Sequence, residues 1–209
     1  MIQGSPEWHE ARRGKVTASQ IEAVMAKGRS GQPSATRANY MADLIIERLT
    51  GRVQDGFKSW DMERGNEVEP QARAVYSLNT GNKIEEVGFV DHPSIPNCGA
   101  SPDGLIGLDG GLELKCPKAA THIKFIETGK IERGYRLQIQ WNMACTGRDW
   151  WDYTTFHPDF PDELQCWIQR VERDDLEIVA IEREVRLFQS EMEDRLTALR
   201  RIRESLSSE

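Results

Sequence analysis

The stretch at 100–117, which reads ASPDGLIGLDGGLELKCP, places a glutamate and a lysine two residues apart inside an apolar run. In a β-strand, residues i and i+2 point to the same face, so Glu113 and Lys115 lie together while the leucines beside them point into the core. A charge next to a buried face is costly unless it is paired. Asp103 lies on the preceding turn and can return to the same face. The segment therefore predicts either an ordinary hairpin or a site that uses these charges.

The residues before the strand favour the hairpin. Ser101, Pro102 and Gly104 occupy the first, second and fourth positions of a four-residue unit, which is good chemistry for a type I turn around Asp103. A Glu-x-Lys pair is also common, because both residues are abundant. On these residues alone, the hairpin is slightly favoured over a catalytic site.

The alternative is a metal site. Asp103, Glu113 and the main-chain carbonyl of Leu114 would supply the oxygen ligands that Mg²⁺ prefers, and Mg²⁺ keeps several waters of its own. Phosphodiester hydrolysis uses such a cation to neutralise the phosphoryl oxygens and to activate water. Lys115 would then orient or deprotonate that water, or stabilise the charge of the transition state.

Composition limits the remaining classes. A chain of 209 residues forms one domain with a sizeable core. The net charge of −7 argues against nucleic acid as a partner, although residues 1–60 carry nine Lys or Arg against six Asp or Glu. The four cysteines have no metal-binding spacing, which indicates structural thiols in a reducing compartment. The sequence has no signal-peptide pattern and no membrane-length apolar run, so we expect no membrane partner.

Hydrophobic periodicity predicts a mixture of helices and strands. Thr17 to Gln20 forms a capping box, which predicts a helix of about three turns after it. Further helices are predicted over 35–49, 60–78 (interrupted by Pro70), 119–129, 133–146 and 183–206, and strands over 84–90, 112–116, 150–156 and 164–171. This order indicates an α/β or α+β fold. We expect a single domain with N-terminal helices (1–60), a core (about 60–172) and a C-terminal helix (about 183–206).

Motifs spread along the chain carry a resemblance. The S-P-D-G-L and G-L-E-L-K-C-P segments resemble the PD-(D/E)xK nuclease core, and more narrowly the phage lambda exonuclease family (YqaJ-like viral recombinases). Residues 8–19 (WHEARRGKVTAS) resemble that family's N-terminal motif, 64–69 (RGNEVE) its acidic segment, and 135–140 (YRLQIQ) its helix with an active-site glutamine. The matches run from about residue 8 to 145 in the family's order.

The resemblance implies a fold and an activity. The fold is α/β, a PD-(D/E)xK restriction-endonuclease-like core with a mixed central β-sheet flanked by helices. The activity is Mg²⁺-dependent 5′→3′ digestion of one strand of linear double-stranded DNA to mononucleotides, leaving a 3′ overhang, with Mn²⁺ as a substitute metal. A homotrimeric ring, a single-strand annealing recombinase as partner, and the cytoplasm of a bacterial host carrying the phage or prophage are also implied.

The family's catalytic residues carry over to matching positions. Asp103, Glu113 and the Leu114 carbonyl match the metal ligands. Lys115 matches the catalytic lysine, Glu69 the additional acidic residue that acts on metal-bound water, and Gln138 the glutamine that positions the nucleophile or the terminal phosphate. One departure concerns Pro70, which disfavours helical geometry at Glu69. Glu67 therefore competes for the same role.

A pocket for the 5′-phosphate is implied at Arg12, Ser19 and Ser101. It also has a physical argument, because Ser19 would lie at the second position of the helix capped by Thr17, and a helix N-terminus attracts anions. Arg12 could add a bidentate contact. Without the resemblance, a plain helix cap is favoured.

Three further positions match DNA contacts of the family. Trp8 begins the N-terminal motif, Arg29 matches an arginine that reaches into the duplex, and Met62 matches an apolar wedge at the terminal base pair. On their own, Trp8 reads as a core or interface residue and Arg29 as a surface charge.

Two other functions stay open. The first is a structure-specific or restriction-like endonuclease of the same fold. The second is a DNA-end-binding ring protein without activity, which the intact set of Asp103, Glu113 and Lys115 argues against.

Overall fold

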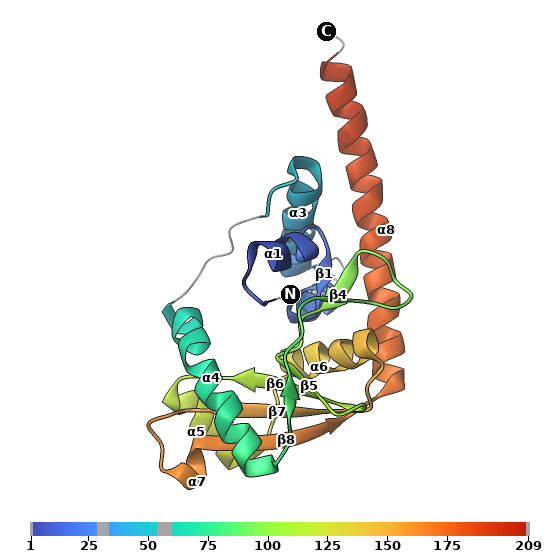
Figure 1. Cartoon of the computed structure of the whole chain (residues 1–209). Coiled ribbons are helices and arrows are strands. Elements are labelled where there is room, and N and C mark those ends of the chain that lie inside the picture. The colour runs from blue at the N-terminus through green and yellow to red at the C-terminus, as the bar shows by residue number, and fades with distance from the viewer. Residues whose placement is uncertain (1, 29–33, 54–59, 208–209) are drawn as a thin grey trace.

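The computed structural model describes residues 2–28, 34–53 and 60–207, without the side chains of 60–64 and 66. A mixed sheet lies low in the molecule with helices on both faces, and a long C-terminal helix rises beyond the body (Figure 1). The helices are α1 (Pro6–Arg12), α2 (Ile21–Met25), α3 (Ala35–Thr50), α4 (Trp60–Thr80), α5 (Ala119–Thr128), α6 (Arg133–Thr146), α7 (Asp162–Gln165) and α8 (Asp175–Leu206), with a 3₁₀ turn, η1 (Ala18–Gln20). The strands are β1 (Val16–Thr17), β2 (Ile84–Glu85), β3 (Val90–Asp91), β4 (Cys98–Ala100), β5 (Gly104–Ile106), β6 (Gly110–Lys115), β7 (Trp150–Phe156) and β8 (Cys166–Glu172).

The larger sheet has the order β2-β5-β6-β7-β8. Strands β6 and β7 run parallel, and every other neighbouring pair in this sheet is antiparallel. A smaller sheet has the order β1-β4-β3, in which β1 and β4 are parallel and Thr17 faces Gly99. The expected mixed sheet flanked by helices is therefore present, and β6 occupies its centre.

Both faces of β6 are covered. Leu112 and Leu114, 0% and 6% exposed, pack in a core that also contains Tyr76 of α4. Glu113 points to the other face, toward α6, and is only 1% exposed. The expectation of a core face and a charged face is therefore incomplete, because helices bury both faces and the glutamate lies inside the protein.

Several predicted elements are confirmed within a few residues. Helices at 35–49, 119–129 and 133–146 correspond to α3, α5 and α6. Each of the three ends at a glycine in the left-handed conformation, the C-cap signal that the sequence carries: Gly51, Gly129 and Gly147. The strand pair at 150–156 and 164–171 corresponds to β7 and β8, although Leu164 belongs to α7.

Other boundaries were wrong. The expected strand at 84–90 is two short strands, because β2 pairs in the larger sheet and β3 in the smaller one. The C-terminal helix begins at Asp175, where Asp174 caps it by accepting a hydrogen bond from the Glu177 N–H at 3.0 Å. The apolar stripe already includes the buried Ile178 and Ile181, but the exposed Leu176 and Val179 beside them blur the helical pattern at this end.

The two turn predictions at the N-terminal side of the site also need correction. Thr17 is the last residue of β1 and makes no side-chain capping bond, and only a 3₁₀ turn and the five-residue α2 follow it. Ser101 and Pro102 lie in a connection that crosses from β4 in one sheet to β5 in the other, with a bend at Asp103. The hairpin turn itself lies between β5 and β6.

The parallel pair β6–β7 depends on glycine. A Cβ atom at Gly111 would lie 2.2 Å from the ring of Trp151, which is fully buried and has no room to move. We expect Gly111→Ala to lower the free energy of unfolding by about 1–3 kcal/mol, the usual cost of overpacking. Chemical unfolding measures this change. Leu108→Ala, in the same hairpin but 96% exposed, is the control and should change stability by less than about 0.5 kcal/mol. Equal effects of the two variants would contradict the packing argument.

Candidate active site

Glu113 is the buried centre of the site. Its Oε1 accepts hydrogen bonds from Lys115 Nζ at 2.5 Å and from Gln138 Nε2 at 2.6 Å, and its Oε2 accepts one from Asn142 Nδ2 at 3.2 Å. Gln138 and Asn142 lie one turn apart on α6, the helix that covers this face of β6. Tyr135, one turn earlier, places its ring 5.2 Å from Lys115 Nζ. One face of α6 therefore holds both charged groups of β6.

Asp103 reaches the same strand from the bend before β5. Its Oδ2 accepts a hydrogen bond from the main-chain N–H of Leu114 at 2.7 Å. This contact brings the first carboxylate beside the segment that carries the second. The sequence prediction that Asp103 returns to Glu113 and Lys115 is thus realised in the geometry, through a bend between two sheets rather than a type I turn.

The charges of the site act strongly on one another. Burial, reinforced by the negative charge of Glu113, raises the pKa of Asp103 to about 8, although Lys115 and the Leu114 N–H oppose the shift. Burial by itself would lower the pKa of Lys115, but the carboxylates of Glu113 and Asp103 outweigh it and raise that pKa above its ordinary value. The lysine is therefore held as an ammonium, chiefly by the carboxylate of Glu113 to which it donates.

Glu69, rather than Glu67, lies toward this cluster. Arg73, one turn further along α4, donates one hydrogen bond to Glu69 Oε1 and another to the main-chain carbonyl of Asp103. The charge of Glu69 also contributes to the raised pKa of Asp103. Glu67 is exposed. The helix continues through Pro70, so the proline does not prevent α4 from presenting Glu69.

The donor set fits a hard divalent cation. Within the described ranges, no three His, Cys, Asp or Glu side chains converge closely enough to hold a metal ion by themselves. However, Mg²⁺ needs only one or two carboxylates when waters and a carbonyl complete its shell. Burial and the charge of Glu113 both disfavour ionised Asp103 and raise its pKa, and a cation between the two side chains would offset both effects.

A second cluster lies where α1 meets the end of β4. Trp8 Nε1 and Arg12 Nη1 each donate to Ser101 Oγ at 2.9 Å, and the guanidinium of Arg12 stacks 4.1 Å from the centre of the Trp8 ring. Burial lowers the pKa of Arg12, while Tyr40 and Glu47 act in the opposite direction. Three of the residues chosen from the sequence therefore form one cluster, in which the Arg12 guanidinium is partly buried.

Ser19 lies at the same end of the smaller sheet. Strands β1 and β4 are parallel, and Thr17 lies opposite Gly99. Ser19 comes two residues after Thr17 and Ser101 two residues after Gly99, so both serines leave the sheet at the same end. The Ser19 hydroxyl is exposed and lies 3.4 Å from that of Thr17. Its place follows from strand pairing and not from the helix N-terminus that the sequence suggested.

Two side chains chosen from the sequence are not among those that the structure describes. Arg29 lies outside the described residues, and so does the side chain of Met62.

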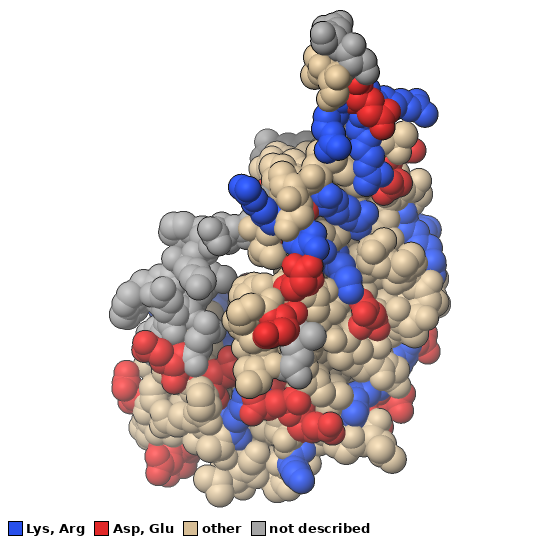
Figure 2. Space-filling view, turned by 45° about the horizontal axis from the view of Figure 1, so that its top comes forward, with Lys and Arg blue, Asp and Glu red and all other residues tan. Residues whose placement is uncertain are grey.

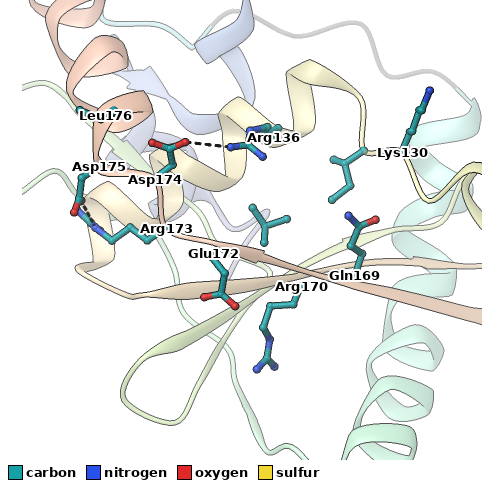
Figure 3. Close-up of a pocket in the computed structure, with 11 residues that line it drawn as sticks. Lys130, Arg136, Gln169, Arg170, Glu172, Arg173, Asp174, Asp175 and Leu176 are labelled. Carbon is teal, nitrogen blue, oxygen red and sulfur yellow. Dashed lines mark hydrogen bonds and ion pairs between the residues drawn. The ribbon is translucent and has the colours of Figure 1, made fainter.

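A pocket of about 670 Å³ lies away from both clusters, against β8 and the start of α8 (Figure 3). Lys130, Arg136 and Asp174 are among the residues around it, and none of the residues chosen from the sequence lines it.

Comparison with known proteins gives the family. The YqaJ-like viral recombinase domain matches residues 7–149, which include both clusters. The chain belongs to this family. The resemblance seen in the motifs is thereby confirmed. Among curated proteins, no match to this YqaJ-like chain was found.

Solved structures agree with this assignment. The alkaline exonuclease LHK-Exo from Laribacter hongkongensis is 46% identical, and the match covers 97% of this chain and 100% of that one with a TM-score of 0.90. LHK-Exo in complex with dAMP matches with a TM-score of 0.91 at the same identity. A phage-related exonuclease from Haemophilus somnus 129PT, 14% identical, covers 91% of this chain and 99% of that one with a TM-score of 0.72, and shows the fold alone. The prediction of a PD-(D/E)xK-like α/β fold is confirmed.

Sequence reasoning missed three side chains of the YqaJ-like site. Arg73 bridges Glu69 and Asp103, Asn142 bonds Glu113, and Tyr135 covers Lys115. Helical spacing was the available signal, because Arg73 lies four residues after Glu69 and Asn142 four after Gln138. Asn142 is fully buried, and its Oδ1 has no hydrogen-bond partner among the described residues. Its side-chain amide therefore makes a single hydrogen bond there, the one that Nδ2 donates to Glu113.

The raised pKa of Asp103 predicts a pH-dependent stability. In the folded protein its carboxyl keeps a proton up to about pH 8, so the cost of ionising it grows as pH rises from about 4 to 8. Without metal, Asp103→Asn removes this cost and should raise the melting temperature by about 2–4 °C for each kcal/mol relieved. The gain should be full at pH 9 and small near pH 4.

Thermal unfolding in chelator across this pH range measures the effect. The Asn side chain keeps an oxygen for the Leu114 N–H, so that hydrogen bond is preserved. A stability gain independent of pH, or a loss at pH 9, would contradict the electrostatic account.

Proposed function

We propose that this protein is a Mg²⁺-dependent deoxyribonuclease, an exonuclease that digests one strand of linear double-stranded DNA from the 5′ end to mononucleotides and leaves a 3′ overhang. The observation that carries the proposal is the cluster of Asp103, on the bend before β5, with Glu113 and Lys115 of β6, in which Glu113 is buried. The similarity to an alkaline exonuclease over nearly the whole chain supports the reaction class.

Each residue of the cluster has a role in this reaction. Asp103, Glu113 and the Leu114 carbonyl would hold the cation. When bound, Mg²⁺ supplies a Lewis acid for the phosphoryl oxygens and lowers the pKa of a coordinated water. Lys115, kept as an ammonium by the carboxylates, would stabilise negative charge on the phosphate and orient the attacking water.

Glu69 and Gln138 complete this arrangement. Glu69 would accept a proton from the attacking water, and Arg73 keeps its carboxylate near Asp103. Gln138 donates to Glu113 through Nε2 and would position the water or the terminal phosphate with its remaining groups. Mn²⁺, which also accepts oxygen ligands, should substitute for Mg²⁺.

The cluster of Trp8, Arg12 and Ser101 supports the choice of a 5′-phosphorylated end. A guanidinium and hydroxyls are suitable donors to a phosphate, and a partly buried cation binds an anion more strongly than an exposed one. Ser19, at the same end of the smaller sheet, would add a hydroxyl. Arg29 and Met62 are proposed to contact the duplex, as in the family's pattern.

We expect a homotrimeric ring around the duplex, a single-strand annealing recombinase as partner, and a place of action in the cytoplasm of a bacterial host. No helix among the described residues has the length and apolar character to cross a membrane.

A digestion experiment separates this function from its alternatives. Linear duplex with a 5′-phosphate or a 5′-hydroxyl, and a closed circle, are incubated with Mg²⁺ or with chelator. We expect degradation of the linear DNA alone, faster with the phosphate. Cutting of the circle would favour the structure-specific endonuclease, and binding of ends without hydrolysis would favour the non-catalytic ring. Equal rates on both linear substrates would contradict the phosphate pocket.

Lys115→Ala should slow hydrolysis strongly while DNA binding persists. Because an ammonium aimed at developing charge contributes about 3–4 kcal/mol, we expect kcat to fall by about 100- to 1000-fold. Single-turnover digestion measures this loss, and Lys118→Ala, outside the cluster, is the control. Activity within a few-fold of the original would exclude Lys115 from the chemistry.

A further inference from the structure

The last turns of α8 carry an apolar stripe that the protomer does not cover. Val185, Phe188, Met192 and Leu196 are fully buried against the body. At the same helical spacing the stripe continues through Leu199, Ile202 and Leu206, which are 41%, 56% and 70% exposed. The exposure rises step by step as the helix leaves the body (Figure 1).

This end is long and basic. The ten residues after Leu196 extend α8 by about 15 Å, at 1.5 Å per residue. Arg195 and Arg203 each lie four residues from Leu199 and therefore flank the stripe, and Arg200 and Arg201 add to the charge. In the space-filling view, Lys and Arg predominate on the upper part of the molecule, and Asp and Glu on the lower part (Figure 2).

A helix end of this kind needs a partner for its stability. Isolated helical turns are marginal in water, and most helical stability comes from packing an apolar face. The match to LHK-Exo covers 97% of this chain, and the uncovered 3% is shorter than the projecting end, so part of that end has a counterpart there. A phosphate backbone would use the arginines but not the leucines, so an apolar centre with an arginine rim fits a protein surface better than DNA.

The opposite end of the protomer offers a complementary surface. Residues 158–165 carry Asp159, Asp162 and Glu163 and no Lys or Arg. Leu164, within the same segment, is 45% exposed, and the side chain of Asp159 is 84% exposed. In Figure 1, α7 lies at the lower end of the molecule and the C-terminus at the upper end. One chain therefore presents a basic apolar helix at one end and an acidic apolar surface at the other.

We propose that the projecting end of α8 docks on the α7 surface of a second copy of this chain. The apolar stripe forms the centre of the contact, and the arginines of α8 face the carboxylates of α7. The contact is head-to-tail, so repeating it generates a closed ring when the rotation between copies closes. This inference deepens the proposed ring by giving its contact surface, and it does not depend on the proposed reaction.

Sedimentation of micromolar protein tests the apolar half of the contact. We expect the native chain to be oligomeric and Leu199→Glu/Ile202→Glu to be monomeric, with association weakened by about 100-fold or more, since each buried charge costs at least tenfold. Val179→Glu is the matched control, because Val179 lies on α8 and is 62% exposed but lies outside the projecting end. Circular dichroism and the melting temperature of the monomer verify that both variants are folded.

A charge exchange tests the acidic half. Arg195→Glu/Arg203→Glu and Asp159→Arg/Glu163→Arg should each weaken the oligomer, and one chain carrying all four changes should regain it. Failure of the combined chain to assemble, with both parents weakened and folded, would overturn the α7 surface as the docking site.

The outcomes also separate this inference from the ring itself. A native chain that is monomeric would overturn both. A native oligomer that the α8 variants leave intact would overturn only the docking of α8, and so would variants that assemble normally but lose binding of DNA or of another protein.

Discussion

The structure depends on one buried carboxylate, that of Glu113 at the centre of the mixed sheet. A charge at 1% exposure is stable only when its hydrogen bonds and charge are satisfied. Lys115 supplies the charge from the same strand, and Gln138 and Asn142 supply donors from α6. The packing of α6 on β6 is therefore linked to the candidate site, because the helix that covers this face of the sheet also bonds the Glu113 side chain.

Asp103 supplies the second carboxyl group of the proposed metal site. Burial and the negative charge of Glu113 raise its pKa to about 8, so the folded protein without a cation keeps a proton on Asp103 near neutral pH. Arg73 fixes the main chain of Asp103 and the side chain of Glu69 with one guanidinium, and the planar fork of arginine suits such a double contact. Stability is thus reduced at a place where a divalent cation would restore it, which is a common arrangement at active sites.

Much of the site could be predicted from the sequence, because it follows from the periodicity and end signals of single strands and helices. Glu113 and Lys115 share a face because strand periodicity is fixed, and the helices α3 and α5 are bounded by glycines at their ends. The features that the sequence did not predict depend on contacts between elements far apart in the chain. The segment 84–90 changes sheets according to its partners, and Arg73 meets Asp103 only because α4 packs on the far face of β6. No local pattern encodes either contact.

The central claim is that Asp103 and Glu113 form a metal site. The most direct test is anomalous diffraction from a crystal of the protein soaked with Mn²⁺, which marks the ion independently of any activity. We predict an anomalous peak bound by both carboxylates and the Leu114 carbonyl, and its loss in a crystal of Glu113→Gln. A peak bound elsewhere, or an equal peak in the Glu113→Gln crystal, would contradict the account.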